Sequence, residues 1–401
     1  MNMPNLQSKE FHNNAHTLFA AMRRDQPVTQ ASFRSRGDVY LVTRYADVEE
    51  LLQGDRLVKD PTNSTLGAKA RRVIAPPKML EGLMSSMLTS DDPEHRRLRK
   101  LVSKAFTPRT ISALEASMET LARDLIKDIL ERKQVDLIEA FALPFPIHII
   151  TELVGVPKED RPRFQRWVHR IVQPPTMINS MAIIPALIGF SRYVRKLANE
   201  KRANPGEDLL SLLVQVEEED AGLSDDELVS MMFLLLVAGH ETTVSLIANG
   251  TLALLTHREE FEKLRNHREL LGSAIEEMLR FDGPLLTTDP YYARETMTLH
   301  GVTIPAGATV LPAVLSANRD EERFEAPDHF DITRSPNKHF SFGKGIHHCL
   351  GAAMTRQEAR IAFSTLLEMA DHIELGVPVE KIRYRPAMFL HRLTALPVSV
   401  R

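Results

Sequence analysis

Only one cysteine, Cys349, occurs in this chain of 401 residues, and this restricts how the fold can be held together. A single thiol cannot form an internal disulfide, and it cannot supply the four cysteines of a structural zinc or iron–sulfur site. It can act as a nucleophile or ligate one metal ion. The usual alternative for a free cysteine is a small, buried core residue. The sequence around Cys349 decides between these roles.

Cys349 lies in a glycine-rich segment, Phe342–Gly351, next to an expected helix. Gly343 and Gly345 allow positive φ angles and a tight turn that brings the backbone close to a flat partner. Residues 350–363 predict a helix that places Cys349 at its N-terminus, where amide donors and the helix dipole stabilise a thiolate. A thiolate on such a turn is well placed to be the axial ligand of haem iron.

Length and composition indicate one domain spanning residues 1–401. The length allows two or three average domains, but no linker rich in Pro, Gly or Ser divides the chain. The net charge of −3 gives no reason to expect nucleic-acid binding. The first 24 residues lack the apolar core of a signal peptide or anchor, and the most apolar run, 228–238, is too short to span a bilayer. We therefore expect a cytoplasmic protein that binds no membrane.

The pattern of helix starts and apolar residues predicts a mainly α protein with a small β part. Residues Ser224 to Glu227 form a capping box that opens a helix to about Thr256. The middle of this helix is apolar on every face, which predicts that it is buried. Further helices are expected at 47–52, 92–107, 111–130 and 262–281. Strands are expected at 40–43, 298–304, 309–314 and near 390–398, as a minor antiparallel sheet component.

The segment Ala238–Thr243 places polar groups inside this apolar helix. Burying the carboxylate of Glu241 is unfavourable unless it is paired. Gly239 weakens the helix by roughly 1 kcal/mol and opens room beside the backbone. Thr242 can donate to the carbonyl four residues earlier or turn its hydroxyl toward a ligand. These groups can relay protons to a ligand; a structural polar pair is the alternative.

The segment Phe342–Gly351 resembles the cysteine-ligand loop of the cytochrome P-450 haem-thiolate monooxygenases. Other stretches resemble this family in the same order, from about residue 40 to residue 400. The resemblance implies the cytochrome P-450 fold, a triangular prism, mainly α with a small β subdomain, around a buried haem b. Cys349 would be the axial ligand of the iron. The chain resembles the soluble bacterial type, which implies a role in secondary metabolism.

The resemblance also gives roles to residues that match the family's motifs. Glu241 and Thr242 match the catalytic acid–alcohol pair of the long central helix. Glu277 and Arg280 match a buried Glu-x-x-Arg pair, and Arg334 matches its partner, with a structural role under the cysteine loop. The spacing of Glu277 and Arg280 alone indicates only an ion pair. A solvated surface pair, contributing less than about 1 kcal/mol, is the alternative.

The two carboxylates of haem need cationic or hydrogen-bond donor partners. His95 and Arg99 are four residues apart on one helix face, so both can reach one carboxylate edge, and His347 matches the family's histidine before the ligand. Where the family usually carries an arginine, this chain has Tyr291, with Arg294 three residues later. The full set of cofactor-binding residues that the resemblance implies is His95, Arg99, Ala238, Tyr291, Phe342, Gly343, His347, Cys349 and Gly351.

Positive side chains indicate a face for docking an acidic electron donor. They are Arg96, Arg97, Lys100 and Lys104 on the helix of His95, and Lys344 and Arg356 beside the cysteine loop. An ordinary solvated helix face is the alternative. The chain has no iron–sulfur cluster motif and no flavin or nicotinamide fingerprint, so electrons must come from elsewhere. The resemblance implies a ferredoxin or flavodoxin with its NAD(P)H-dependent reductase, and a monomeric enzyme without a fused reductase or ferredoxin domain.

The leading interpretation is a monooxygenase that inserts one atom of O2 into an apolar small molecule, by hydroxylation or epoxidation. The segments expected to face the substrate are rich in Met, Leu, Ile and Pro, as an adaptable apolar pocket requires. They are 59–88, 171–189, 235–238, 284–292 and 388–390. Terpenoids, steroids, fatty acids and macrolide-like polyketides all remain open.

Two other functions compete with this interpretation. A peroxide-driven peroxygenase is one, but that subclass lacks the acid–alcohol pair present here as Glu241 and Thr242. A non-catalytic haem protein that binds a ligand or senses a gas is the other. It would explain Cys349 and leave a buried Glu241 unexplained.

Overall fold

The structure is a computed structural model that describes residues 3–33, 37–66, 86–172, 177–219, 222–387 and 389–401. The smaller part of the molecule contains the helices α1 (Lys9–Asn13), α2 (Ala15–Asp25), α3 (Tyr45–Gln53) and α16 (Val314–Ala317). The larger part contains α6 (Glu94–Ala105), α7 (Pro108–Ser112), α8 (Glu115–Arg132), α9 (Pro144–Leu153), α10 (Arg161–Val172), α11 (Met177–Ala203), α12 (Leu209–Glu219), α13 (Asp225–Thr256), α14 (Arg258–Asn266), α15 (Leu271–Asp282) and α17 (Ala352–Met369).

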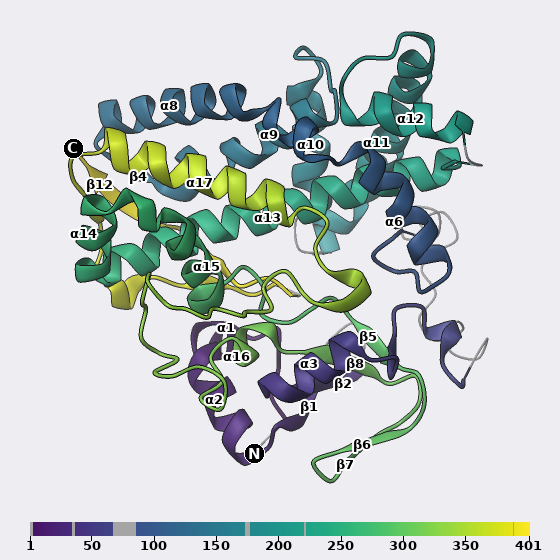
Figure 1. Ribbon diagram of the computed structural model, residues 1–401, viewed down its shortest axis with the longest axis vertical. Helices are drawn as coiled ribbons and strands as arrows, with labels where there is room; N and C mark the ends of the chain where they lie inside the picture. The colour runs from purple at the N-terminus through teal and green to yellow at the C-terminus, as the bar shows by residue number, and fades with distance from the viewer. Residues whose placement is uncertain (1–2, 34–36, 67–85, 173–176, 220–221, 388) are drawn as a thin grey trace.

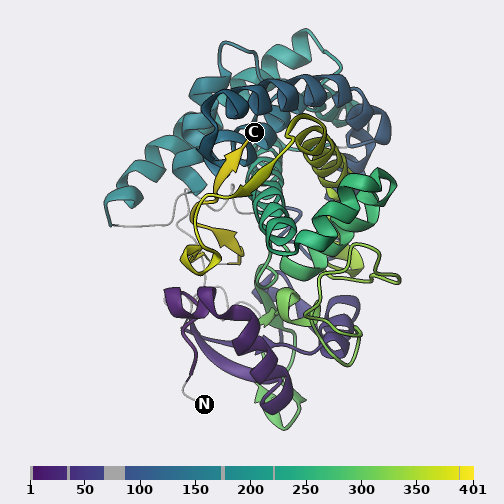
Figure 2. The same ribbon diagram turned by 90° about the vertical axis from the view of Figure 1, so that its left-hand side faces the viewer.

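Helix α13 is the central element of the larger part. Its capping box is formed as expected, with Ser224 accepting from the Glu227 amide and Glu227 accepting from the Ser224 amide. It ends at Thr256, as expected, and most of its side chains are buried against α9, α15 and α17. Figure 2 shows α13 passing through the middle of the helical part. Its length and composition would also suit a membrane span, but such a buried helix is equally typical of a protein core.

Strands of the described residues form four small sheets. The largest has the order β1 (Val28–Phe33), β2 (Gly37–Val42), β8 (Thr309–Pro312), β5 (Tyr291–Ala293) and β3 (Leu57–Val58). A second has the order β4 (Gln134–Asp136), β12 (Pro397–Val400) and β9 (Ile373–Leu375). The other two are hairpins, β6 (Met297–Leu299) with β7 (Val302–Ile304), and β10 (Tyr384–Arg385) with β11 (Arg392–Leu393). Figure 1 shows the largest sheet beside the N-terminal helices, away from α8 and α17.

Three sequence-based expectations about the sheets are corrected. The pairing is not all antiparallel, because β2 and β8 are parallel. The expected strand 298–304 is a hairpin, which turns at His300 and Gly301 with φ angles of 48° and 77°. The expected strand 309–314 ends at Pro312, and Val314 begins α16.

Two long expected helices are divided. The stretch 111–130 splits into α7 and α8, and the stretch 262–281 splits into α14, a 3₁₀ turn at Arg268–Leu270, and α15. Neither break between these helices contains Gly or Pro, so no helix-breaking residue in the sequence marks where one helix ends and the next begins. Helix α6 begins at Glu94 with Pro93 as its N-cap, and the Asp92 carboxylate pairs with Arg96 at 2.7 Å instead of capping the helix.

Candidate active site

The cysteine loop, residues 342–351, is a tight turn before α17. The Cys349 amide donates to the Phe342 carbonyl at 2.8 Å, and the Gly343 amide donates to the Phe340 carbonyl at 2.7 Å. Gly343 and Gly345 have φ angles of 65° and 72°, as the sequence predicts. A Cβ atom on Gly345 would lie 2.2 Å from the Leu52 carbonyl oxygen, so only glycine fits there. Helix α17 begins three residues after Cys349, at Ala352.

The surroundings of Cys349 act on its ionisation in both directions. Burial raises the pKa of the Cys349 thiol, and the opposing effects of the Gly351 amide and of Arg99 and Arg356 are smaller. Cys349 is a free cysteine that lines a cavity. A metal ion bound to the sulfur would supply the missing stabilisation, since a coordinating thiol loses its proton.

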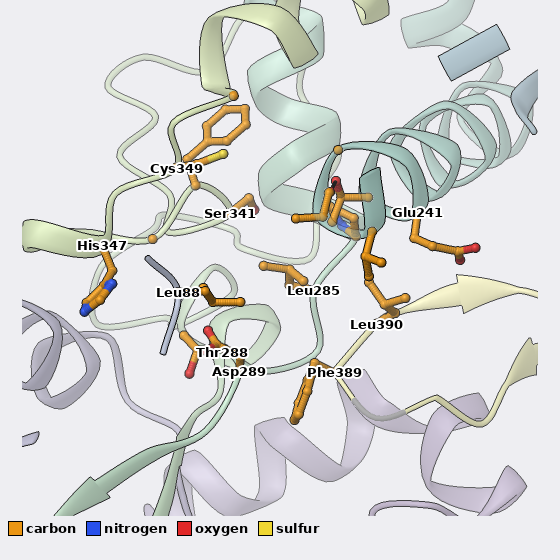
Figure 3. Close-up of a pocket in the computed structure, with 18 of the residues that line it drawn as sticks. Leu88, Glu241, Leu285, Thr288, Asp289, Ser341, His347, Cys349, Phe389 and Leu390 are labelled. Atoms are coloured by element: carbon orange, nitrogen blue, oxygen red, sulfur yellow. Dashed lines mark hydrogen bonds between the residues drawn. The ribbon is translucent and has the colours of Figure 1, made fainter. Parts of the chain in front are cut away.

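The cavity has a volume of about 1200 Å³ and a mainly apolar wall. Figure 3 shows Cys349 and His347 on one side of it, and Leu390 on the other. Ala238 is exposed although it lies in the middle of α13, because it lines this cavity. The expected cofactor-contacting residues Phe342, Gly343 and Gly351 also belong to the wall.

Two histidines line the cavity, and each has a buried Nε2 atom that is unused among the described residues. The rings of His95 on α6 and His347 have centroids 4.3 Å apart, and neither Nε2 atom has a hydrogen-bond partner among the described residues. Burial, then Lys59 and His95, lower the pKa of His347 to about 3, so its imidazole is neutral. The Arg99 guanidinium also lines the cavity, and among the described residues it donates only to the Ile346 carbonyl, at 3.3 Å. Buried donors without acceptors are costly, so this wall suits an anionic ligand.

Haem fits this arrangement. Its iron needs a thiolate or imidazole ligand on one side, which Cys349 can supply, and its carboxylates need the donors that His95, Arg99 and His347 present. The remaining wall is apolar, as the porphyrin ring requires. The three sequence-predicted carboxylate partners therefore come together on the Cys349 side of one cavity.

Tyr291, and not Arg294, occupies the position beside these donors. Tyr291 on β5 is buried, lines the cavity and has its ring centroid 6.0 Å from that of His347, whereas Arg294 is exposed and does not line the cavity. Sequence reasoning missed Lys59, whose Nζ atom lies 3.4 Å from the Tyr291 ring centroid and 2.6 Å from an Asp289 carboxylate oxygen. Burial raises the pKa of Tyr291, so the hydroxyl keeps its proton as a donor.

Glu241 is buried, and an arginine 151 positions later in the sequence compensates its charge. The carboxylate is in an ion pair with Arg392 of β11, and Figure 3 shows it turned away from Cys349. The Thr242 hydroxyl donates to the Ala238 carbonyl at 2.6 Å, one of the two expected alternatives. Both residues line the cavity. A Cβ atom on Gly239 would meet only Ile150, at an ordinary 3.6 Å, so packing among the described residues does not demand this glycine.

A second buried carboxyl group, Glu358 on α17, also lines the cavity and was missed in the sequence. The Thr243 hydroxyl lies 3.0 Å from its Oε2 atom and 3.1 Å from the Gly239 carbonyl. Burial raises the pKa of Glu358 to about 8, so this side chain is protonated at neutral pH. The sequence around Glu358 does not indicate that it lines the cavity, because its hydrogen-bond partner Thr243 lies 115 residues away.

The Glu-x-x-Arg pair forms the buried cluster that the resemblance implies. Glu277 and Arg280 on α15 are fully buried and joined by two hydrogen bonds of 2.8 Å. Arg334 donates to Glu277 at 3.2 Å, and Asn337 donates to it at 3.0 Å. Arg280 also donates to the carbonyls of Asn318, Pro327 and His329. The cluster thus fixes the long segment that leads to the cysteine loop.

The expected docking cations lie on α6 and beside the cysteine loop, but many already have partners. Arg96 pairs with Asp92, and Arg97 pairs with Glu94 at 2.6 Å and with Glu227. Lys344 pairs with Glu49, and Arg356 pairs with Glu276 at 2.7 Å. Lys100 and Lys104 are exposed. The net positive charge of this face is therefore smaller than the sequence suggests.

The expected substrate-facing segments reach the cavity in part. Residues from 86–88, 235–238, 284–291 and 389–390 line it. Residues 67–85, 173–176 and 388 of these segments lie outside the described residues. The wall residues that sequence reasoning missed include a group from the N-terminus and the C-terminal hairpin: Asn5, Gln7, Ser8, Arg385, Pro386, Ala387 and Arg392.

The chain is similar over its whole length to proteins of a known family. The sequence model of the family described as Cytochrome P-450 matches residues 1–391. The polyketide biosynthesis cytochrome P-450 PksS of Bacillus subtilis is 40% identical over 395 residues, which cover 98% of this chain and 97% of PksS. The cytochrome P-450 monooxygenase PikC of Streptomyces venezuelae is 38% identical over 396 residues, which cover 98% of this chain and 92% of PikC.

Solved structures agree with these matches. The structure of PksS from the bacillaene polyketide synthase of Bacillus subtilis has a TM-score of 0.92 and covers 99% of this chain and 100% of its own. The myxobacterial cytochrome P-450 CYP267B1 in complex with myristic acid has a TM-score of 0.91 at 39% identity, and covers 99% of this chain and 98% of its own. The cytochrome P-450 fold expected from the sequence is confirmed.

Proposed function

The chain belongs to the cytochrome P-450 family and is a haem-thiolate oxidoreductase, and from this premise we propose that it hydroxylates an apolar small molecule with one atom of O2. One observation carries the proposal. The Cys349 thiol, the Nε2 atoms of His95 and His347, which have no partner among the described residues, and the Glu241–Thr242 pair all line the same apolar cavity. This supports the proposal that one cavity would hold the iron ligand, the carboxylate donors, the proton relay and the substrate.

Haem b is the proposed form of the cofactor. Cys349 would be its axial ligand, and His95, Arg99, Tyr291 and His347 would bind its carboxylates. Ala238, Phe342, Gly343 and Gly351 would pack against the ring. When bound, the haem supplies the activation of O2 that no side chain can provide. The neutral imidazole of His347 carries one N–H group, and the buried Tyr291 phenol keeps its O–H group, so each can donate to a carboxylate.

Glu241 and Thr242 would bring protons into the cavity. The Thr242 hydroxyl donates to Ala238, so its oxygen is left to accept from water or substrate at the cavity wall. Glu241 is held by Arg392 and turned away from Cys349, so it must leave this partner to hand a proton toward Thr242. The arrangement suits general acid catalysis, in which a positioned acid donates when the reacting group needs the proton.

A polyketide-derived molecule is the proposed substrate class. The cavity wall is mainly apolar, which suits a macrolide or a polyketide chain beside the haem. PksS is a polyketide biosynthesis protein, and another relative, at 36% identity, is the 6-deoxyerythronolide B hydroxylase of Saccharopolyspora erythraea. Hydroxylation is the primary proposal, and epoxidation by the same site is included.

Electrons are proposed to come from a ferredoxin or flavodoxin with its NAD(P)H-dependent reductase. The exposed Lys100 on α6 would contribute to docking an acidic donor. We further propose that the protein is a single cytochrome P-450 domain that works as a monomer in the cytoplasm. Sedimentation of the purified holoenzyme tests the oligomeric state.

An isotope experiment tests the reaction. The purified holoenzyme is supplied with a surrogate ferredoxin, its reductase and NADPH, and with a panel of macrolactones, linear polyketide acids, fatty acids and steroids. Under ¹⁸O2, the product should carry one labelled oxygen atom, and ¹⁸O-labelled water with unlabelled O2 should give none. Product that forms only when hydrogen peroxide replaces the electron donors would contradict the proposal and support a peroxygenase.

A further inference from the structure

The charged residues described along the cavity wall mostly have a partner or a proposed role, and Arg385 has neither. Glu241 pairs with Arg392, Asp289 pairs with Lys59, and Lys344 pairs with Glu49. Glu358 is protonated at neutral pH, and Arg99 lies among the proposed haem carboxylate partners. Arg385 is only partly exposed, yet it makes no hydrogen bond, ion pair or ring contact in the part of the chain that the structure describes.

The position of Arg385 explains why no anion in the described part of the chain pairs with it. Arg385 on β10 lies directly opposite Arg392 on β11 in the antiparallel hairpin. Like charges in such a pair repel each other. The carboxylate of Glu241 is near both, but it is engaged with Arg392. Burial, then Arg392, lower the pKa of Arg385. This wall of the cavity therefore has two cations and one anion.

The wall with the surplus charge lies across the cavity from the cysteine loop. Figure 3 shows Leu390, which directly precedes His391 and β11, on the opposite side from Cys349 and His347. Pro386, Ala387 and Phe389 give the same wall an apolar surface. Helix α1 packs against this hairpin, where the Asn13 side chain accepts from the Tyr384 amide at 2.9 Å. A substrate that reaches from the haem held by Cys349 to the opposite wall would thus have its remote end near Arg385.

We propose that Arg385 binds a carboxylate at the end of the substrate that is remote from the reacting carbon. A carboxylate is a planar monoanion that matches the fork of a guanidinium group, and it neutralises the single surplus charge. A phosphate dianion would overcompensate it. The substrate is therefore an apolar molecule with a terminal carboxylate, such as a linear polyketide acid. This inference rests on the proposed function, since it needs a small-molecule substrate in the same cavity.

Pairs of acids and their methyl esters test the role of Arg385. The probes are myristic acid, a linear polyketide acid and a steroid carboxylic acid, each with its ester. Dissociation constants are measured by calorimetry and by the substrate-induced spectral shift of the holoenzyme. For the wild type we expect at least one acid to bind about tenfold or more tightly than its ester, because a hydrogen bond to a charged group contributes about 1.5–3 kcal/mol.

Three variants make the measurement specific. Arg385→Gln should abolish the preference for the acid and leave the affinity for the ester within about twofold. Arg385→Lys should restore part of the preference, since it keeps the charge but loses the fork. Arg383→Gln is the matched control, because Arg383 lies in the same segment, is exposed and does not line the cavity. It should leave both affinities unchanged.

The outcomes separate this inference from the proposed function. A wild type with no acid preference for any pair overturns the role of Arg385, and so does an equal loss of acid and ester affinity in Arg385→Gln. A protein without the thiolate-type carbon monoxide spectrum contradicts the haem-thiolate function instead. A preference for the acid that survives in Arg385→Gln also overturns the proposal, whether or not it persists in Arg383→Gln.

Discussion

The carboxylate of Glu241 on α13 forms an ion pair with Arg392 on β11, although the two residues are 151 positions apart in the chain. Both side chains are buried. The pair connects the central helix with the C-terminal hairpin across the cavity wall. Because a buried charge without a partner is strongly unfavourable, Arg392 explains how a carboxylate can persist in an apolar helix.

We predict that Glu241→Gln and Thr242→Ala uncouple electron consumption from product formation. Each variant removes a group that delivers protons, so the rate of product formation should fall by about tenfold or more and hydrogen peroxide should accumulate. NADPH consumption, product and peroxide are measured together. Thr251→Ala is the control, because Thr251 donates to the carbonyl four residues earlier in the same helix but does not line the cavity. Normal coupling in both relay variants would exclude these residues from the mechanism.

The buried cluster around Glu277 should be a major contributor to stability. Glu277→Gln leaves the fully buried Arg280 and its neighbour Arg334 without their carboxylate. We expect a loss of about 3–5 kcal/mol in the free energy of unfolding, as for other broken buried pairs. Denaturant unfolding followed by circular dichroism measures it. Arg123→Gln, which breaks the exposed pair with Glu368, should leave the unfolding midpoint unchanged; equal effects of the two variants would contradict the prediction.

Docking of the electron donor should depend on Lys100 more than on Arg97. Lys100 is exposed on α6, whereas Arg97 is held by Glu94 and Glu227. Lys100→Glu should slow the first reduction by an acidic ferredoxin and reduce its dependence on salt, since exposed charges are screened beyond about 8–10 Å at physiological ionic strength. Stopped-flow reduction measures both effects. Lys127→Glu on α8 is the exposed control, and the same slowing in that variant would mean that α6 is only a solvated face.

Glu358 should make stability depend on pH. Burial raises its pKa from 4.5 to about 8, so between these values the folded protein holds a proton that the unfolded chain has released. Its contribution to stability is therefore present at low pH and is lost as the pH rises toward 8. Compared with wild type, Glu358→Gln should become relatively more stable from pH 5 to pH 8 in thermal unfolding. A constant difference between the two melting temperatures across this range would show that Glu358 does not titrate as described.

Much of the fold could be predicted where the signal is local. The capping box at Ser224 and the apolar faces after it gave both ends of α13, and Gly343 and Gly345 marked the turn of the cysteine loop. The divisions after α7 and α14 were missed because no Gly or Pro marks them. The parallel pairing of β2 with β8 was missed because it joins segments far apart in the sequence.

The candidate site could likewise be predicted only where its signal is local in the sequence. Cys349, His347, Glu241 and Thr242 could be found from motifs whose members are adjacent in sequence. Arg392 and Lys59 could not, because each is defined by a partner more than 100 residues away. Arg385 gives still less signal, since its significance lies in the absence of an internal partner among the described residues.

The carbon monoxide difference spectrum of the reduced protein tests the central claim most directly. We expect the purified protein to bind one haem b and to show the long-wavelength Soret band that is specific to thiolate ligation. Cys349→Ser should lose this band even where it retains haem. A histidine-type carbon monoxide spectrum in freshly purified wild type, or the long-wavelength band in Cys349→Ser, would contradict ligation by Cys349.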